Sequence, residues 1–311
     1  MKMLITGALG HIGSKLIHAI KPGQFDEVRL IDNMMTQRYA SLFNLPEGVN
    51  FRFIEEDICA ADLDKYFEGI DMVVHLAAVT DAAASYEKKG LVDNINYHGT
   101  EKVAQACIKN GCKLIFPSTT SVYGTQEEIV DEECSELKPQ SPYAESKLKA
   151  EQLLIKFGKE SDLKYIICRL GTIFGVSVGM RFHTAVNKFV WQACLGQPIT
   201  VWRTAMNQKR PYLDLNDAVA AFLYVIKKDL FVNEIYNIVT GNFTVSEIIE
   251  IISGEVSDIS INHVESKIMN QLSYAVQSDK FKKEGFKFQG DVKQGIKATI
   301  NILSGARRKG G

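Results

Sequence analysis

The sequence LITGALGHIG at residues 4–13 places three glycines, Gly7, Gly10 and Gly13, directly after a short β-rich run. In such a pattern the first glycine permits a tight turn, the second lets the backbone approach a pyrophosphate, and the third lets the following helix pack closely on the strand. A helix that begins here presents free N–H groups and the positive end of its dipole to an anion. The stretch therefore predicts a strand, a turn and a helix that together bind a dinucleotide.

An acidic residue follows about twenty positions later, as this kind of unit requires. Asp32 ends a second β-rich run, Val28–Ile31. Its carboxylate could accept hydrogen bonds from the adenosine ribose hydroxyls and would repel a 2′-phosphate, which favours NAD(H) over NADP(H). Asp32 could instead only cap a turn, and the nearby Arg29 and Arg38 leave NADP(H) as an open alternative.

Residues 1–170 alternate short apolar runs with longer helical patterns. The expected strands are Lys2–Ile5, Val28–Ile31, Asn50–Ile54, Met72–Leu76, Leu114–Pro117 and Tyr165–Arg169, and the expected helices are His11–Ile20, Leu63–Phe67, Leu91–Asn110 and Tyr143–Phe157. This alternation predicts an α/β fold with a Rossmann-type, doubly wound parallel sheet covered by helices on both faces.

After about residue 170 the pattern loosens. Helices are expected at Thr184–Leu195, Asn216–Lys227 and Val245–Ile252, and strands at Ile199–Trp202, Ile235–Ile238 and Ser260–His263. We therefore expect an NAD-binding Rossmann domain over residues 1–170 and a smaller, mixed α/β substrate-binding lobe over residues 171–311. Some segments of the second part should return to the first.

Composition excludes several classes of protein. The chain has 311 residues, 36 Lys and Arg against 37 Asp and Glu, and a net charge of -1, which gives no basic excess for nucleic-acid binding. No apolar run approaches the roughly 20 residues of a membrane span, and the N-terminus lacks the pattern of a signal peptide, so we expect no membrane partner and a cytoplasmic protein. The six scattered cysteines indicate reduced thiols, and no cluster has metal-ligand spacing, so we expect no metal.

Residues 141–147 read SPYAESK and suggest proton-transfer chemistry. Tyr143 and Lys147 are four residues apart and therefore lie on the same face of a helix. An ammonium group beside a phenol favours the phenolate and should lower the tyrosine pKa, which allows the tyrosine to move a proton near neutral pH. The alternative is an ordinary pair on a helix surface.

A second candidate element is the hydroxyl-rich run Phe116–Gly124, which follows a predicted strand. In open α/β sheets the carboxyl ends of the strands line the ligand crevice. A hydroxyl in this run could bond the same substrate oxygen that Tyr143 serves.

Taken together, these motifs resemble those of an extended short-chain dehydrogenase/reductase of the NAD-dependent nucleotide-sugar epimerase/dehydratase family. The resemblance covers about residues 1–230. It rests, in family order, on TGALGHIG (6–13), Asp32, Asp57-Ile58, HLAA (75–78), Asn96 with Gly99-Thr100, STTSVYG (118–124), SPYAESK (141–147), RLGTIFG (169–175) and RPYLDLND (210–217).

The resemblance implies roles position by position. Tyr143 would be the acid/base, Lys147 its electrostatic partner and a contact of the nicotinamide ribose, and Thr119 the hydroxyl that bonds the reacting sugar. The implied NAD contacts are Gly7, Gly10, His11, Ile12, Gly13, Asp32, Asn33, Asp57, Ile58, Leu76, Ala77, Ala78, Asn96, Tyr143 and Lys147. The implied substrate contacts are Thr80, Thr119, Thr120, Thr172, Asn187 and Arg210, of which Arg210 would grip the substrate diphosphate with its planar fork.

Two departures from the family pattern bear on the reaction. The 4,6-dehydratase members carry an Asp-Glu pair after the catalytic threonine, where this chain has Thr120 and Ser121. Without a carboxylate, elimination of water lacks an acid and a base. Thr172 replaces a substrate-contacting asparagine of the family, and Asn187 is our substitute candidate for the substrate phosphate region.

We therefore expect an NDP-sugar 4-epimerase that oxidises C4 with NAD and returns the hydride to the other face. An NDP-sugar 4-dehydrogenase or 4-ketoreductase would use the same residues and remains the alternative, ahead of a 4,6-dehydratase or a non-enzymatic NAD-binding regulator. We also expect a homodimer, because the two helices that follow Asn96 and start at Tyr143 resemble the family's dimer helices. Their apolar residues include Val103, Ala106, Leu148 and Leu153.

Overall fold

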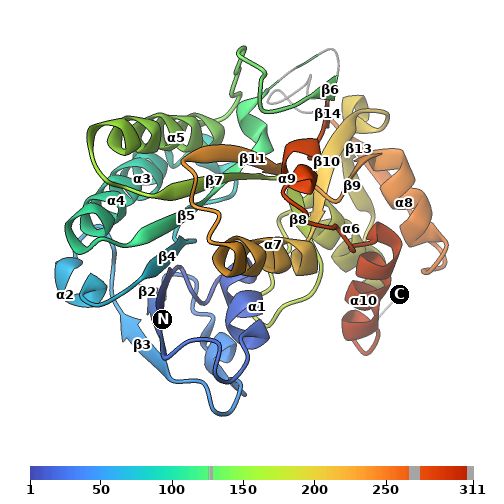
Figure 1. The fold of residues 1–311 in the computed structure, drawn as a ribbon. Coiled ribbons are helices and arrows are strands. Elements are labelled where there is room, and N and C mark those ends of the chain that lie inside the picture. Colours follow the sequence, from blue (N-terminus) through green and yellow to red (C-terminus); the bar gives the residue numbers. More distant parts are fainter. Residues whose placement is uncertain (125, 127–128, 266–273, 307–311) are drawn as a thin grey trace.

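A seven-stranded parallel sheet forms the centre of the computed structural model, which describes residues 1–124, 126, 129–265 and 274–306 (Figure 1). Its strand order is β11-β7-β5-β4-β1-β2-β3. The strands are β1 (Lys2–Thr6), β2 (Glu27–Asp32), β3 (Phe51–Glu55), β4 (Met72–His75), β5 (Lys113–Thr119), β7 (Tyr165–Leu170) and β11 (Glu234–Ile238). The strand order reverses direction between β1 and β4, and this is the point where the carboxyl ends of parallel strands border a ligand crevice.

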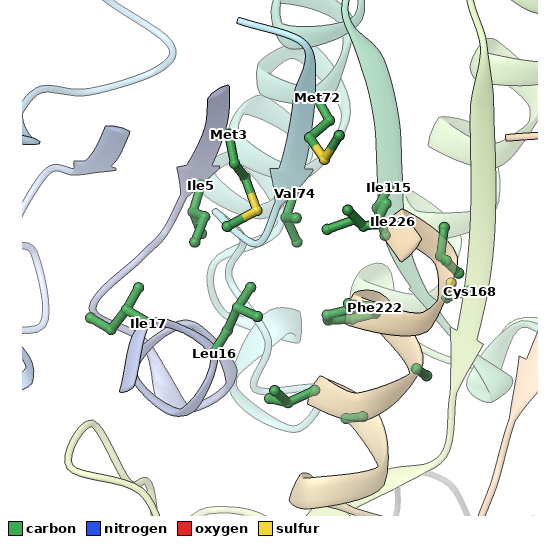
Figure 2. Close-up of a cluster of buried hydrophobic side chains, with 14 of the residues drawn as sticks. Met3, Ile5, Leu16, Ile17, Met72, Val74, Ile115, Cys168, Phe222 and Ile226 are labelled. Atoms are coloured by element: carbon green, nitrogen blue, oxygen red, sulfur yellow. The ribbon is translucent and has the colours of Figure 1, made fainter. Parts of the chain in front are cut away.

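Helices cover both faces of this sheet. On one face, α1 (His11–Ala19) and α7 (Leu215–Lys228) pack against alternate side chains of the strands. Figure 2 shows the side chains of β1 and β4 pointing toward those of the two helices, with Ile5 and Val74 above Leu16 and Phe222. On the other face, α2 (Asp64–Phe67), α4 (Gly99–Asn110) and α5 (Pro142–Glu160) bury a second apolar cluster. The strands therefore carry apolar residues on both sides, as covered parallel strands require.

The expected helix over residues 91–110 is not continuous. It consists of α3 (Lys89–Asp93), a π-helical turn (Asn94–His98) and α4. The turn contains Asn96, whose side chain is buried among hydrogen-bond partners of neighbouring segments. Wider turns of this kind are uncommon and are frequent at functional sites.

The smaller lobe packs beside the carboxyl ends of the strands. Its sheets are β12-β10-β8 and β13-β9, formed by β8 (Thr172–Phe174), β9 (Ile199–Trp202), β10 (Lys209–Asp214), β12 (Gly241–Thr244) and β13 (Ile261–Val264). The helices α6 (Ala185–Cys194), α8 (Val245–Ser253) and α10 (Val292–Leu303) enclose its core. The remaining elements are the paired strands β6 (Ile129–Val130) and β14 (Ala275–Val276), the helix α9 (Asp279–Lys283), and the 3-10 turns Tyr39–Leu42, Ala84–Tyr86, Thr120–Val122 and Arg203–Ala205.

The Rossmann-type fold class is confirmed, and the expected elements of residues 1–170 occur with shifts of a few residues. Sequence analysis missed β6, β8, β10, β12, β14, α9 and α10. β11 follows residue 170 in the sequence but pairs with β7 in the large sheet, and a domain boundary at residue 170 stays a prediction. In the described part of the chain, no helix has both the length and the apolarity needed to cross a bilayer.

Candidate active site

The loop between β1 and α1 brings its backbone close to β4. Gly7 has φ +63°, and a Cβ atom there would lie 2.5 Å from the backbone nitrogen of Ala77. A Cβ on Gly13 would lie 2.4 Å from the carbonyl oxygen of Ala8, so glycine allows α1 to start tightly against the loop. Gly10 caps α1 without a side-chain hydrogen bond, which leaves the first amides of the helix open to an anion.

Asp32, at the end of β2, shapes this loop. Its Oδ2 accepts a hydrogen bond from the Leu9 amide at 3.0 Å and its Oδ1 accepts one from the Met34 amide at 3.0 Å. Each carboxylate oxygen has a further lone pair that can receive a ribose hydroxyl. The residue thus caps a turn and remains able to bind a ribose, so the two sequence interpretations are compatible.

A cavity of about 100 Å³ lies beside this carboxylate. Of the predicted NAD contacts it is lined by Gly7, Gly10, Asp32, Asn33, Asp57, Ile58, Leu76, Ala77 and Ala78. Burial raises the pKa of Asp57, but hydrogen bonds from Cys59 and Asn33 outweigh it and the net shift is downward, which keeps this carboxylate charged. Arg38 also lines this cavity, and burial lowers its pKa while Asp32 opposes that shift. We call it the cofactor cavity.

A second cavity of about 370 Å³ opens at the ends of β5 and β7 and extends to the small lobe. The predicted site residues that line it are Ile12, Leu76, Ala78, Thr80, Thr119, Tyr143, Lys147, Thr172 and Arg210. Leu76 and Ala78 line both cavities, so the two spaces are neighbours. We call this second space the reaction cavity.

Tyr143 is placed by the start of α5. The Ser141 hydroxyl accepts a hydrogen bond from the Ala144 amide at 3.2 Å, and Pro142 occupies the first turn, so the helix begins sharply one residue before the tyrosine. The amide of Tyr143 in turn donates to the Ser85 hydroxyl at 3.3 Å. These contacts fix the backbone that carries the phenol into the reaction cavity.

The expected lowering of the Tyr143 pKa by Lys147 is wrong for this structure. Burial raises the pKa of Tyr143, and the groups that oppose this rise are the Arg181 guanidinium and the Thr119 hydroxyl. Burial also lowers the pKa of Lys147 to about 7, although Glu151 partly offsets the shift. A buried ammonium without an ion-pair partner loses part of its charge and therefore loses part of its effect on a neighbouring phenol.

Lys147 lies next to a network of buried side chains. Its Nζ atom lies 4.3 Å from the centre of the Phe116 ring, in a cation–π contact. One turn later on α5, Glu151 receives hydrogen bonds from the Ser118 hydroxyl and from Arg169, whose Nη2 lies 2.8 Å from Oε2. The hydrogen bond between Ser118 and Glu151 fixes the end of β5 against α5. It thereby places Thr119 beside Tyr143.

Five residues that were predicted to contact NAD or the substrate line neither cavity. They are His11, Gly13, Asn96, Thr120 and Asn187. His11 bonds Ser177 through Nδ1 at 2.8 Å, and the Thr120 hydroxyl donates to the Leu170 carbonyl at 3.3 Å.

Two buried amide side chains hold backbone instead. Asn96 exchanges hydrogen bonds with both backbone groups of Val79, at 2.8 and 2.9 Å, and donates to Ser146. Asn187 donates to the Arg181 carbonyl at 3.1 Å and accepts from the Gly175 amide at 3.3 Å. The expectation that the Asn187 side chain reaches the substrate phosphate is therefore not supported, because its amide is already bound.

The comparisons with known proteins identify the family. Residues 3–239 match the NAD dependent epimerase/dehydratase family. The chain belongs to this family. NAD is the family's cofactor, and the close backbone approach at Gly7, the open amides of α1 and the carboxylate of Asp32 fit this dinucleotide.

Family members of both reaction types are similar to the chain. A trifunctional UDP-glucose 4,6-dehydratase/UDP-4-keto-6-deoxy-D-glucose 3,5-epimerase/UDP-4-keto-L-rhamnose-reductase of Arabidopsis thaliana is 30% identical over 315 residues, 96% of this chain and 46% of that protein. The chain thus spans about half the length of this relative. The dTDP-D-glucose 4,6-dehydratase of Bos taurus is 29% identical over 96% of the chain and 87% of its own length. The structure of UDP-glucuronic acid 4-epimerase from Bacillus cereus, in complex with UDP-glucuronic acid and NAD, has a TM-score of 0.90 and 26% identity over 98% of this chain and 100% of that one.

Family motifs did not reveal every residue of the reaction cavity. Arg181, Lys188, Ser121 and His183 line it in addition to the predicted set. Arg181 and His183 lie in the loop between β8 and α6, where no periodic pattern exists to place them. Lys188 lies on the expected helix α6 and Ser121 in the turn after β5, but their residue types alone gave no signal of a place in the cavity.

A larger and more open hollow of about 1080 Å³ lies between α7 and the segment that leads into α10. It contains none of the predicted site residues. It also lies away from the carboxyl ends of the central strands, where ligands bind in this family's fold. We therefore place the chemistry in the smaller reaction cavity. Among the described residues, no three His, Cys, Asp or Glu side chains gather in a way that could hold a metal ion.

Proposed function

We propose that the protein is an NAD-dependent 4-epimerase of a nucleotide-diphosphate sugar. The observation that carries this proposal is that Thr119, Tyr143 and Lys147 line one cavity, and that this cavity adjoins the dinucleotide loop at Leu76 and Ala78. The likeness to a UDP-glucuronic acid 4-epimerase supports it.

Each residue has a defined task in this proposal. The Tyr143 oxygen takes the proton of the C4 hydroxyl and later returns it, while the Thr119 hydroxyl orients the same sugar oxygen. Lys147, which lines the reaction cavity, would bond the nicotinamide ribose. Arg210, whose Nη2 donates to Gln208 at 3.1 Å, binds the substrate diphosphate with its remaining donors. When bound, NAD supplies the hydride acceptor.

A 4,6-dehydratase is a second candidate, and the bovine and plant relatives favour it. The side chains of the reaction cavity argue against it, because Asp81 is the only carboxylate among the described residues that line the cavity. Elimination of water needs both an acid and a base near the sugar. Thr120 is turned away, and Ser121 cannot act as a carboxylate.

Product analysis separates the candidate reactions. The purified protein would be incubated with NAD and a panel of UDP- and dTDP-sugars, and the products identified by NMR. A 4-epimerase gives the C4 epimer without net NADH, a 4-dehydrogenase accumulates NADH and a ketosugar, and a 4-ketoreductase consumes NADH with a ketosugar substrate. Loss of water from the product would replace our proposal with a dehydratase.

Tyr143→Phe tests the proposed acid/base. The variant keeps the ring but removes the ionisable oxygen, so turnover should fall by about 10²–10⁴ while NAD binding stays near that of the parent. Tyr224→Phe is the control, since it also removes one hydroxyl hydrogen bond, to the Glu284 carbonyl, but lies outside both cavities. Equal turnover of Tyr143→Phe and the parent would disprove the proposed role.

We also propose a homodimer with a cytoplasmic location. Of the four apolar residues expected at the dimer interface, Val103, Ala106 and Leu153 are already buried within the single chain. These three therefore contribute little surface to an interface. Leu148 and the exposed Leu91 of the adjoining α3 remain for an interface. Light scattering at micromolar concentration should give the mass of two chains, and the mass of one chain would contradict the proposal.

A further inference from the structure

The segment that links β8 to α6, residues 176–184, crosses the dinucleotide loop and is called the strap here. The Ser177 hydroxyl lies 2.8 Å from His11 Nδ1, and the Gly179 amide donates to the Ser14 hydroxyl at 2.9 Å. At the other end, Asn187 of α6 holds the Arg181 carbonyl. The strap is thus fixed to both lobes, and it carries Arg181 into the reaction cavity.

The guanidinium of Arg181 is incompletely paired. Its Nη1 atom donates a hydrogen bond to the Thr80 hydroxyl. Its Nε atom is buried and has no hydrogen-bond partner among the described residues. No ion pair joins Arg181 to a carboxylate in the described part of the chain, although Asp81 lies near enough to raise the pKa of Arg181. Arg169, by contrast, is buried and has the carboxylate of Glu151 at 2.8 Å. Arg181 is half-buried, but its buried Nε–H is unsatisfied and no ion pair neutralises its charge, which is costly and points to an anion that arrives with a ligand.

Charge in the reaction cavity supports the same conclusion. Four cationic side chains line it, Lys147, Arg181, Lys188 and Arg210, against the single carboxylate of Asp81. The proposed function gives the diphosphate to Arg210 and the nicotinamide ribose to Lys147. It gives no task to Arg181 or to Lys188, and of these two only Arg181 has a buried, unpaired N–H group among the described residues.

The position of Arg181 identifies which part of the substrate it would meet. Arg181 and Tyr143 influence each other electrostatically, since the guanidinium lowers the pKa of the phenol and the phenol raises that of the guanidinium. Burial lowers the pKa of Arg181 to about 10, and it therefore stays charged at neutral pH. Because Arg181 and Tyr143 also line the same cavity, the guanidinium faces the space in which the sugar would react.

We propose that Arg181 binds a carboxylate carried by the reacting sugar, so that the substrate is an acidic nucleotide sugar. This inference rests on the proposed function and narrows its substrate class. A carboxylate matches the planar donor pattern of a guanidinium, and its charge offsets the uncompensated cation. The competing occupant is the pyrophosphate of NAD, because the strap lies on the dinucleotide loop.

Binding of a matched pair of ligands tests the inference. UDP-glucuronate and UDP-glucose differ at C6, where the first carries a carboxylate and the second a hydroxymethyl group. Titration calorimetry on the NAD-loaded protein should give tighter binding of UDP-glucuronate by about 10–100-fold. Arg181→Gln should remove most of this preference while changing the Kd of UDP-glucose and of NAD by less than about 3-fold. Arg181→Lys should keep part of it, because the charge remains without the fork.

Arg203→Gln is the matched control, since Arg203 is 68% exposed and outside both cavities. It should retain the full preference for the acid. Equal affinity of the parent for both sugars would overturn the inference while leaving the proposed function intact. A loss of NAD affinity in Arg181→Gln with an unchanged sugar preference would assign Arg181 to the cofactor pyrophosphate. If neither sugar, nor the corresponding dTDP pair, binds to the parent, the proposed function fails and the inference fails with it.

Discussion

The reaction cavity is lined by four cationic side chains and, among the described residues, by the single carboxylate of Asp81. Lys147 and Arg181 lie within it without an ion-pair partner among the described residues, and burial lowers the pKa of both. The helical spacing of Tyr143 and Lys147 was predictable from sequence, because it depends only on the 3.6-residue period. Their pKa values were not, since these depend on Thr119, Glu151 and other groups that only the fold brings near.

The buried ammonium of Lys147 should lower the free energy of unfolding of the protein. Its pKa of about 7 in the folded protein lies below the ordinary 10.5, so the unfolded chain binds the proton more tightly and folding is penalised below pH 10.5. The penalty at pH 7 is on the order of 4 kcal/mol and shrinks as pH rises from 7 to 10.5. Lys147→Met should therefore stabilise the nucleotide-free protein at pH 7 and abolish most of its turnover.

Urea unfolding at pH 7 and pH 10 measures this effect. Lys149→Met, on the same helix and 55% exposed at its side chain, is the control and should change the free energy of unfolding by less than about 1 kcal/mol at either pH. If Lys147→Met is no more stable than the parent at pH 7, the ammonium is better solvated than its burial indicates.

At the scale of elements, the strands and the helices of the first lobe followed from apolar runs and glycines. The strap and the π-helical turn could not be predicted in this way, because their sequences show no periodic pattern of apolar residues. Both are joined by hydrogen bonds to segments further away in the sequence, such as Asn96 to Val79 and Gly179 to Ser14. Hydrogen bonds of this kind join residues that the sequence does not place together, so the substrate-facing part of the site was predicted less completely than the dinucleotide loop.

The contact between strap and dinucleotide loop is testable at Gly179. A Cβ there would lie 2.4 Å from the Leu9 carbonyl oxygen and 2.8 Å from that of Gly10, both backbone atoms that cannot move aside alone. Gly179→Ala should push the strap off the loop, destabilise the protein by about 1–3 kcal/mol and weaken NAD binding by at least about 10-fold.

Gly90→Ala provides the comparison, because a Cβ at Gly90 in α3 meets nothing within 4 Å. That change should be neutral or slightly stabilising, since alanine favours helix. Calorimetric titration with NAD and a thermal melt on both variants give the two readouts. Unaltered NAD affinity in Gly179→Ala would show that the strap does not control the loop.

For the whole molecule, the first lobe was easier to predict than the second. Covered parallel strands such as β1 and β4 are nearly continuous apolar runs. By contrast, β8 has only three residues, β12 is half-buried and β10 has charged residues at both ends, so these strands carry no clear signal. The two lobes meet where the strap crosses α1 and where β11 returns to the large sheet. Stability and the site therefore depend on the same contacts.

The buried histidines give this molecule a defined response to acid. Burial lowers the pKa of His75 to about 3, with a further contribution from Lys147. Burial likewise lowers that of His11 to about 3, with Arg181, Arg38, His183 and Lys15 adding to the shift. Both are neutral when folded but protonate near 6.5 when unfolded. The unfolded chain thus binds more protons between pH 6.5 and 3, and the free energy of unfolding should fall as pH falls through that window, by about 1.4 kcal/mol per pH unit for each histidine.

His75→Gln isolates one of these two contributions. The Nδ1 of His75 lies 2.7 Å from the Thr6 hydroxyl and its Nε2 lies 3.0 Å from the Thr100 hydroxyl, and a glutamine amide can still bond one of them without titrating. Between pH 6 and pH 4 the variant should lose about 1.4 kcal/mol per pH unit less than the parent, even if it is less stable at pH 7. His263→Gln, at an exposed position of β13, should keep the parental slope. Because the slope rather than the absolute stability is measured, a packing defect at residue 75 cannot mimic the result, and equal slopes in His75→Gln and the parent would show that His75 does not drive the acid response.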